Sequence, residues 1–170
     1  MKFDVEPYKG YEEPYGLLCA ILDDGTRDWR SQMDPNLGAD AMVWQPHPGM
    51  HSIGGCILHV AAIEIRGFER IALGTATDPE ERKMLMVDET DIDGINWPKP
   101  HHEPLSWYFD LHDRIRARTL ESVKKWGPPT TSMKNGDREI TLRWVFGHII
   151  QHEAYHGGQA LLLQELWKRL

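Results

Sequence analysis

Residues 141–168 read TLRWVFGHIIQHEAYHGGQALLLQELWK, and this stretch decides the fold. Its apolar residues recur every three or four positions, which is the spacing of one face of an α-helix. We expect one long helix over about the whole stretch. At about 100° per residue, His152 and His156 fall on the same face as Val145 and Ile149. Their imidazoles should therefore point into the protein.

Three more segments show helical spacing. They run from about Glu13 to Met33, from Ser52 to about Leu73, and from about Pro104 to Lys125. Prolines and glycines separate them, such as Gly127-Pro128-Pro129 after the third segment. Four amphipathic helices predict an all-α fold, a four-helix bundle in a single domain over residues 1–170.

The connections between these helices differ in length. Residues 37–51 are rich in proline and are expected to be extended. Residues 76–103 form a long crossover between the second and third helices, with a short helix near Met84-Leu85-Met86. A connection of this length is usually a crossover or a lid over a site. Asn135-Gly136 is a strong turn signal and predicts a short hairpin within residues 130–138.

The composition is that of an ordinary globular protein and excludes several function classes. The chain has 41% hydrophobic and 26% charged residues and a formal net charge of -7, which argues against nucleic acid or an anionic membrane as a partner. Two cysteines are too few for a disulfide scaffold and suit a reducing cytosol. No run approaches the ~20 apolar residues of a membrane span, and the first residues do not resemble a signal peptide. We expect a cytoplasmic protein.

Two imidazoles on the apolar face of the last helix need polar partners, because unpaired buried polar groups cost a few kcal/mol. A divalent metal meets that need, since histidines four residues apart on a helix form a common chelating pair. His148 cannot share the ion with His156, because the two lie ~12 Å apart along the helix axis. The pattern thus points to His152 and His156 as metal ligands.

At least one more ligand must come from another helix. His59, near the edge of the apolar stripe of the second helix, is the best candidate. His112 in the third helix is the runner-up, and Cys56 is a further candidate as a soft ligand. Three neutral imidazoles leave coordination positions open, which is the arrangement of catalytic rather than structural metals. They suit Zn, Ni, Cu or Fe alike.

Other polar residues near the pair are candidates for further roles. Glu153 is a candidate general base only if it turns toward the site, the alternative being a surface carboxylate. Gln159, one turn beyond His156, can orient a ligand or substrate. Arg66, two turns past His59, can meet an anionic substrate group, the alternative being a solvated charge.

Residues 152–156, His-Glu-Ala-Tyr-His, also match the H-E-x-x-H pattern of zincin proteases. That class takes its third ligand from downstream, and no histidine follows His156. Glu165 lies nine residues on in the same helix, too far along the axis. We therefore set the protease interpretation aside.

These residues resemble the DinB-like (YfiT-like) superfamily of metal-dependent enzymes. The matching stretches are Trp44-Gln45-Pro46 to Ser52-Ile53-Gly54, Leu58-His59-Val60-Ala61, and His148 to Gln159 with its H-x-x-x-H-x-x-Q pattern. The resemblance implies a bundle of up-down-down-up topology, a nickel or zinc site on His59, His152 and His156, and a homodimer. Many relatives carry arginine after the last histidine, where this chain has Gly157.

The resemblance implies a metal-dependent enzyme, either a hydrolase or a transferase that uses a low-molecular-weight thiol. A small-molecule substrate would then bind beside the metal. The alternative is a non-catalytic module, a metal-stabilised bundle that binds a small molecule or serves as a structural dimer. The sequence does not separate these, because both need the same ligands.

Overall fold

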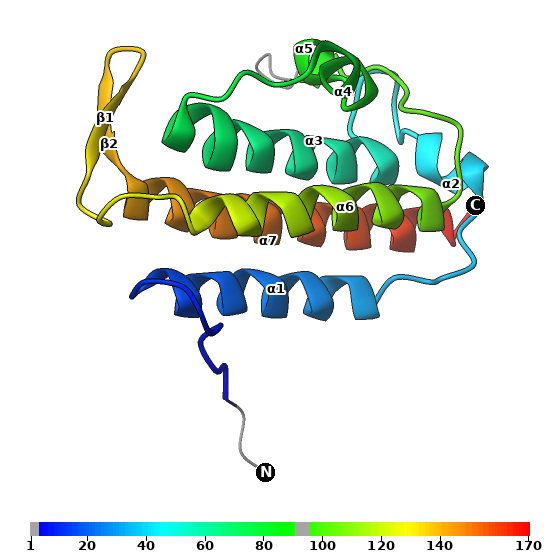
Figure 1. Cartoon of the computed structure of the whole chain (residues 1–170). Helices are drawn as coiled ribbons and strands as arrows, with labels where there is room; N and C mark the ends of the chain where they lie inside the picture. Colours follow the sequence, from blue (N-terminus) through cyan, green and yellow to red (C-terminus); the bar gives the residue numbers. More distant parts are fainter. Residues whose placement is uncertain (1–3, 91–95) are drawn as a thin grey trace.

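A computed structural model describes residues 4–90 and 96–170. Its described part is mostly helical (Figure 1). In chain order the elements are α1 (Tyr15–Ser31), α2 (Ala39–Val43), α3 (Ile53–Ile65), the π-helical segment η1 (Arg66–Ile71), α4 (Pro79–Met84), α5 (Val87–Thr90), α6 (Leu105–Val123), β1 (Ser132–Asn135), β2 (Arg138–Thr141) and α7 (Leu142–Trp167). No helix of the described residues is long and apolar enough to cross a membrane.

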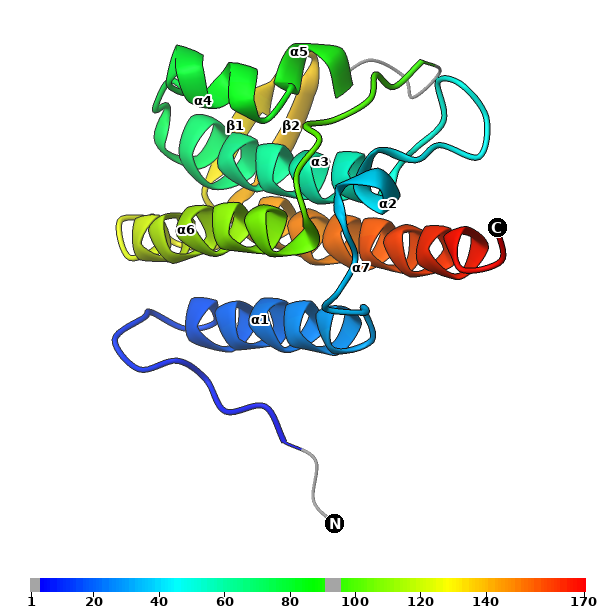
Figure 2. The ribbon, with the colours of Figure 1, turned by 90° about the vertical axis from the view of Figure 1, so that its right-hand side faces the viewer.

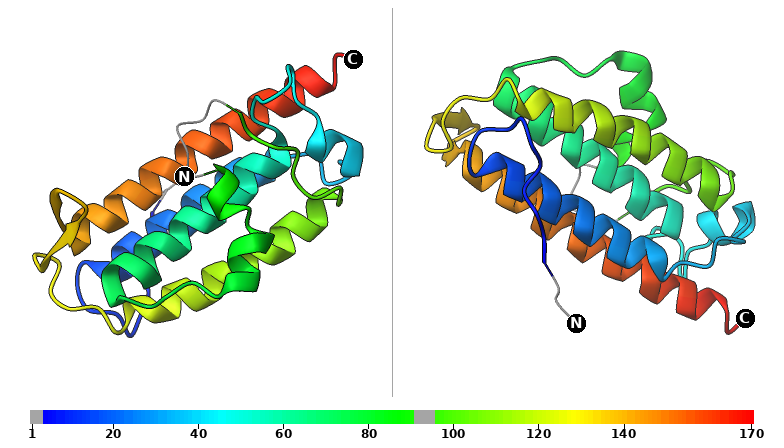
Figure 3. Two further views of the ribbon diagram at one scale, coloured as in Figure 1. Left: turned by 90° about the horizontal axis from the view of Figure 1, so that it is seen from above. Right: turned by 60° about the horizontal axis from the view of Figure 1, so that its bottom comes forward.

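Four long helices lie side by side. Figures 2 and 3 show α1, α3, α6 and α7 running along a common direction, and α7 contacts both α1 and α3 while α6 packs on α3. The four long helices predicted from the sequence are thus present, with ends within a few residues of the expected ones. Residues 91–95 of the predicted crossover lie outside the described part.

Polar caps set the start of the two helices that matter most here. The Ser52 hydroxyl accepts a hydrogen bond from the amide of Gly55 at 3.2 Å and begins α3. The Thr141 hydroxyl accepts one from the amide of Trp144 at 3.3 Å and begins α7. Each cap satisfies an amide that the helix itself leaves without a partner.

The buried apolar side chains form two clusters. One surrounds Ile57 and Tyr108. The other surrounds Phe68 and Phe146 and includes Ile140 of β2 and Leu142 at the start of α7. On α1, α6 and α7 a buried polar residue separates the two clusters, namely Thr26, Arg116 and Glu153 respectively. The core is therefore interrupted by a polar layer.

The structure corrects the sequence-based interpretation of two connections. Residues 37–51 were expected to be extended, but Ala39–Val43 form the short helix α2, which buries Met42. The helix expected at residues 84–86 is displaced: α4 ends at Met84, and α5 begins at Val87. The predicted hairpin is present as β1 and β2, with Gly136 at a φ of 62° in the turn.

The second predicted helix changes its winding near its end. It is α-helical to Ile65 and then π-helical over Arg66–Ile71. Within this segment, Gly67 lies so close to α7 that an added Cβ would be 2.5 Å from the Cδ1 of Ile149. The glycine permits a close approach of η1 and α7 just beyond His59.

Candidate metal centre

Three histidines converge between α3 and α7. His59 comes from α3, and His152 and His156 come from successive turns of α7. The Nε2 atoms of His59 and His152 are 3.2 Å apart. One ring nitrogen from each of the three residues lies within 4.8 Å of the other two. We call these residues the histidine triad.

The spacing of the triad fits a shared metal ion. Metal–nitrogen bonds of about 2.0–2.1 Å at a tetrahedral angle place two bound nitrogens about 3.3 Å apart. The observed 3.2 Å between the Nε2 atoms of His59 and His152 agrees with that value. His156 is buried, and the other two rings are partly buried. The donor set and its geometry therefore suit a divalent cation.

The triad histidines are neutral at physiological pH. Burial, and then the neighbouring imidazoles, lower the pKa of His59 and of His152 to about 3. Burial also lowers the pKa of His156 to about 4, although its hydrogen bond with Gln159 acts the other way. Neutral imidazoles keep a lone pair for a metal, so no proton has to be displaced when an ion binds at pH 7.

Gln159 sits beside the triad. Its Oε1 lies 2.7 Å from Nδ1 of His156. An amide oxygen only accepts hydrogen bonds, so Nδ1 must carry the proton and Nε2 keeps its lone pair. Such a partner holds a metal-binding imidazole in one tautomer and one orientation.

Glu153 is not brought to the triad. Its carboxylate is only 3% exposed and faces α1 and α6 instead. It accepts hydrogen bonds from the Thr26 hydroxyl at 2.6 Å, from Trp29 Nε1 at 3.1 Å, and from Arg116. The sequence-based interpretations of Glu153 were a surface carboxylate or a base turned toward the metal, and neither predicted this buried position.

His112, the alternative third ligand, lies in the same buried region as Glu153. Its ring nitrogens are 3.3 Å from Glu64 Oε2 and 2.6 Å from Arg30 Nη2. A carboxylate oxygen of Glu64 and of Glu153 and a ring nitrogen of His112 also lie within 4.8 Å of one another. Arg116 binds both carboxylates, so a guanidinium already supplies the cation there. We call Glu64, His112, Arg116 and Glu153 the buried ion-pair layer.

Cys56 is fully buried, and burial raises the pKa of its thiol to about 12. A thiol with that pKa stays protonated at pH 7 and is a poor ligand. In the part of the chain that the structure describes, it joins none of the groups that can hold a metal. The structure thus places His59, and neither His112 nor Cys56, beside the pair on α7.

Two residues that sequence reasoning missed lie over the triad. The ring of Trp97 is centred 5.0 Å from that of His59, and the ring of His51 is 4.0 Å from that of Trp97 and 6.0 Å from that of His156. Gln45 donates to the carbonyls of Met50 and Trp97, which ties the two covering segments together. No local pattern marks these loop residues, because their contacts are made across the fold.

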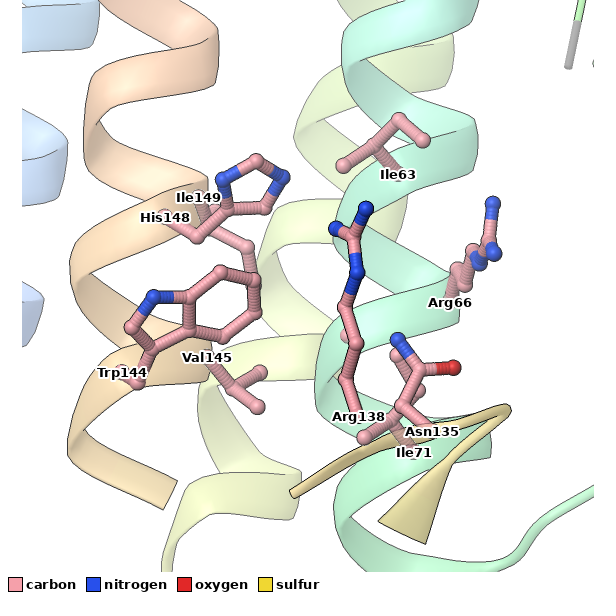
Figure 4. Close-up of a pocket in the computed structure, with 10 residues that line it drawn as sticks. Ile63, Arg66, Ile71, Asn135, Arg138, Trp144, Val145, His148 and Ile149 are labelled. Atoms are coloured by element: carbon pink, nitrogen blue, oxygen red, sulfur yellow. The ribbon is translucent and has the colours of Figure 1, made fainter. Parts of the chain in front are cut away.

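A cavity of about 220 Å³ opens next to the triad, between α3, η1, α7 and the hairpin (Figure 4). His148, one turn before His152, lines it, and the two rings are 5.9 Å apart. The other lining residues are Ile63, Arg66, Gly67, Ile71, Asn135, Arg138, Trp144, Val145 and Ile149. The predicted substrate contact Arg66 thus lines this cavity, whereas none of the three triad histidines does.

Gly157 follows the last triad histidine and has a packing role. An added Cβ at this position would lie 2.8 Å from Cγ of Trp29 on α1. A larger side chain would have to push α1 and α7 apart. The arginine that many resembling proteins carry here does not fit against Trp29.

A comparison with models of known protein families identifies a family for this chain. A model described as the DinB superfamily matches residues 33–160, a range that includes His59, His152, His156 and Gln159. None of the curated proteins matches the chain. The matched range covers most of the chain and all of the triad.

Proposed function

We propose that this chain, which belongs to the DinB superfamily, is a metal-dependent enzyme whose metal is held by His59, His152 and His156. The observation that carries the proposal is the convergence of three neutral imidazoles from two helices, with two Nε2 atoms 3.2 Å apart. Three protein ligands leave at least one coordination position for a water or a substrate.

The chemistry would be that of an activated nucleophile. A bound divalent ion lowers the pKa of a coordinated water or thiol, so that the nucleophile is available at neutral pH. Gln159 would hold His156 in the required tautomer. Trp97 and His51 would limit the access of bulk water. We assign no proton transfer to Glu153, because its carboxylate is engaged by Arg116 on the other side of α7.

We propose a hydrolase or a thiol-dependent transferase, with zinc or nickel as the metal and a low-molecular-weight thiol as a candidate co-substrate. Membership of the superfamily supports this choice. On the same ground we propose the up-down-down-up topology for the four long helices, and a homodimer in the cytoplasm.

The alternative is a metal-stabilised module that binds a small molecule or serves as a structural dimer and catalyses nothing. The cavity beside the triad favours a ligand in either case, because it is lined by both apolar and charged side chains. The two functions differ in turnover, not in the residues that they need.

The test has two stages. Elemental analysis should find one metal per chain in the native protein and none in His59→Ala or His152→Ala. The control His102→Ala changes an exposed histidine that pairs with Asp40 and is not part of the triad, and it should keep the metal. Metal retained at full occupancy by His152→Ala would overturn the site.

The metal-loaded protein is then incubated with an activated ester, with and without a low-molecular-weight thiol such as glutathione. Consumption of the ester that is lost in His152→Ala supports an enzyme. Stoichiometric metal with no turnover above the variant would favour the binding module.

A further inference from the structure

The cavity beside the triad has an unusual charge for this protein. The chain as a whole is acidic, with 26 Asp and Glu against 19 Lys and Arg. Among the residues that the structure describes, the cavity lining contains two arginines, Arg66 and Arg138, and no Asp or Glu. Guanidinium groups form charge-assisted hydrogen bonds with anions, so these two residues suit an anionic ligand.

Carboxylates bind other exposed arginines of this chain in ion pairs. Arg118 bonds Glu69 and Glu81, and Arg27 bonds Asp24. Within residues 4–90 and 96–170, no side-chain hydrogen bond or ion pair involves Arg138. Its guanidinium can therefore serve an incoming anion without first giving up a partner.

Two stacked rings form one wall of the cavity. The rings of Trp144 and His148 are stacked at 4.9 Å with an interplanar angle of 6°. Figure 4 shows Arg138 reaching from the hairpin between these rings on α7 and Ile63 on α3. A flat aromatic wall suits a planar molecule.

The volume limits the size of the ligand. At about 220 Å³ the cavity equals the liquid volume of roughly seven waters. That is enough for a small organic molecule and too little for a polymer segment. The ring of His148, which lines the cavity, is 5.9 Å from that of His152 in the triad.

We propose that Arg66 and Arg138 bind the carboxylate of a small planar organic acid, whose flat body packs on Trp144 and His148. This assignment rests on the proposed function and names its substrate class. The guanidinium fork matches the two oxygens of a carboxylate. A single negative charge also loses less hydration than a phosphate on entering a cavity with an apolar floor.

The probe is benzoate, titrated into the metal-loaded protein and followed by NMR at the indole N–H of Trp144. Benzamide has the same shape without the charge, and phenyl phosphate carries the other common anion. We expect benzoate to shift the Trp144 signal and to bind at least about tenfold more tightly than benzamide, because charge-assisted hydrogen bonds are the stronger ones.

The variants Arg138→Met and Arg66→Gln should each weaken benzoate binding by about tenfold or more. The matched control Arg143→Gln removes an exposed arginine that does not line the cavity, and it should leave binding unchanged. Circular dichroism checks that each variant is folded. Equal binding of benzamide, tighter binding of phenyl phosphate, or benzoate binding unaffected by both cavity variants would overturn the proposal.

A separate measurement distinguishes this proposal from the proposed function. The benzoate titration is repeated after chelation, and the metal content is determined in parallel. Binding that survives chelation and still depends on Arg138 supports the carboxylate site, even if the protein proves to lack a metal. Binding that vanishes with the metal and ignores Arg138 would mean that benzoate binds the ion, and the proposal fails.

Discussion

Arg116→Met is expected to lower the free energy of unfolding by about 3–5 kcal/mol, the usual cost of removing one partner from a buried ion pair. The side chain of Arg116 is 8% exposed, and those of its partners Glu64 and Glu153 are 0% and 3% exposed. Its Nε donates to both oxygens of Glu64 at 2.9 and 3.0 Å. Without the guanidinium, two carboxylates stay buried with too little positive charge.

The matched control is Arg118→Met, two residues further along α6. The Arg118 side chain is 48% exposed, and it pairs with Glu69 and Glu81 at the surface. Exposed ion pairs contribute about 0–1 kcal/mol, so this variant should lose no more than that. Both free energies come from urea denaturation followed by circular dichroism. Equal losses in the two variants would refute the assignment of Arg116 as a buried structural cation.

The loss should also depend on pH. Burial raises the pKa of Glu64, but Arg116 and His112 outweigh it and hold that pKa below its ordinary value. In Arg116→Met the opposing charge is gone, so Glu64 takes up a proton at a higher pH than in the native protein. The difference in stability between variant and native protein should therefore shrink as the pH falls from 7 toward 5. A difference that stays constant over this range would contradict the electrostatic explanation.

Three further predictions concern the triad and its surroundings. Gln159→Leu should weaken metal binding by about 10–100-fold in a competition titration with a chelator. The exposed control Gln151→Leu should leave metal binding unchanged. Equal metal affinities of the two variants would exclude the orienting role of Gln159. The pKa values of His59 and His152 are lowered to about 3. The metal-free protein should therefore lose stability as the pH falls from about 6.5 toward 3, because the unfolded chain takes up protons that the folded chain does not. Constant stability in urea denaturation across that window would show that the rings are not buried. Gly157→Ala places a Cβ 2.8 Å from Trp29, and it should lower the free energy of unfolding by about 1–3 kcal/mol in thermal denaturation. In the control Gly158→Ala the new Cβ meets no atom within 4 Å, and this variant should gain up to about 1 kcal/mol of stability. The same change in both variants would refute the packing argument.

The long helices were predictable because their signals are local. The apolar spacing of residues 141–168 specifies both a helix and the face on which His152 and His156 lie, and the structure has α7 at Leu142–Trp167. His59 was the best third candidate for a similar reason, since it borders the apolar stripe of its own helix. The short helix α2 was missed because prolines nearby made the whole of residues 37–51 look extended.

Features that depend on pairing between helices were not predictable. Glu153 is bound by Thr26, 127 residues away in sequence, and by Arg116, 37 residues away. The position of Glu153 next to His152 in the sequence does not predict these contacts. Trp97 and His51 cover the triad from two loops that the sequence does not relate to each other. Sequence periodicity shows which face of a helix is buried, but it does not show which partner a buried polar group will meet.

The most direct test is an anomalous-scattering map from crystals grown with zinc or nickel, with data collected at the absorption edge of the metal. We expect one strong peak between α3 and α7, about 2.0–2.1 Å from Nε2 of His59, from Nε2 of His152 and from a ring nitrogen of His156. A peak between Glu64, His112 and Glu153 instead, or three rings turned away from a common point, would contradict the metal centre.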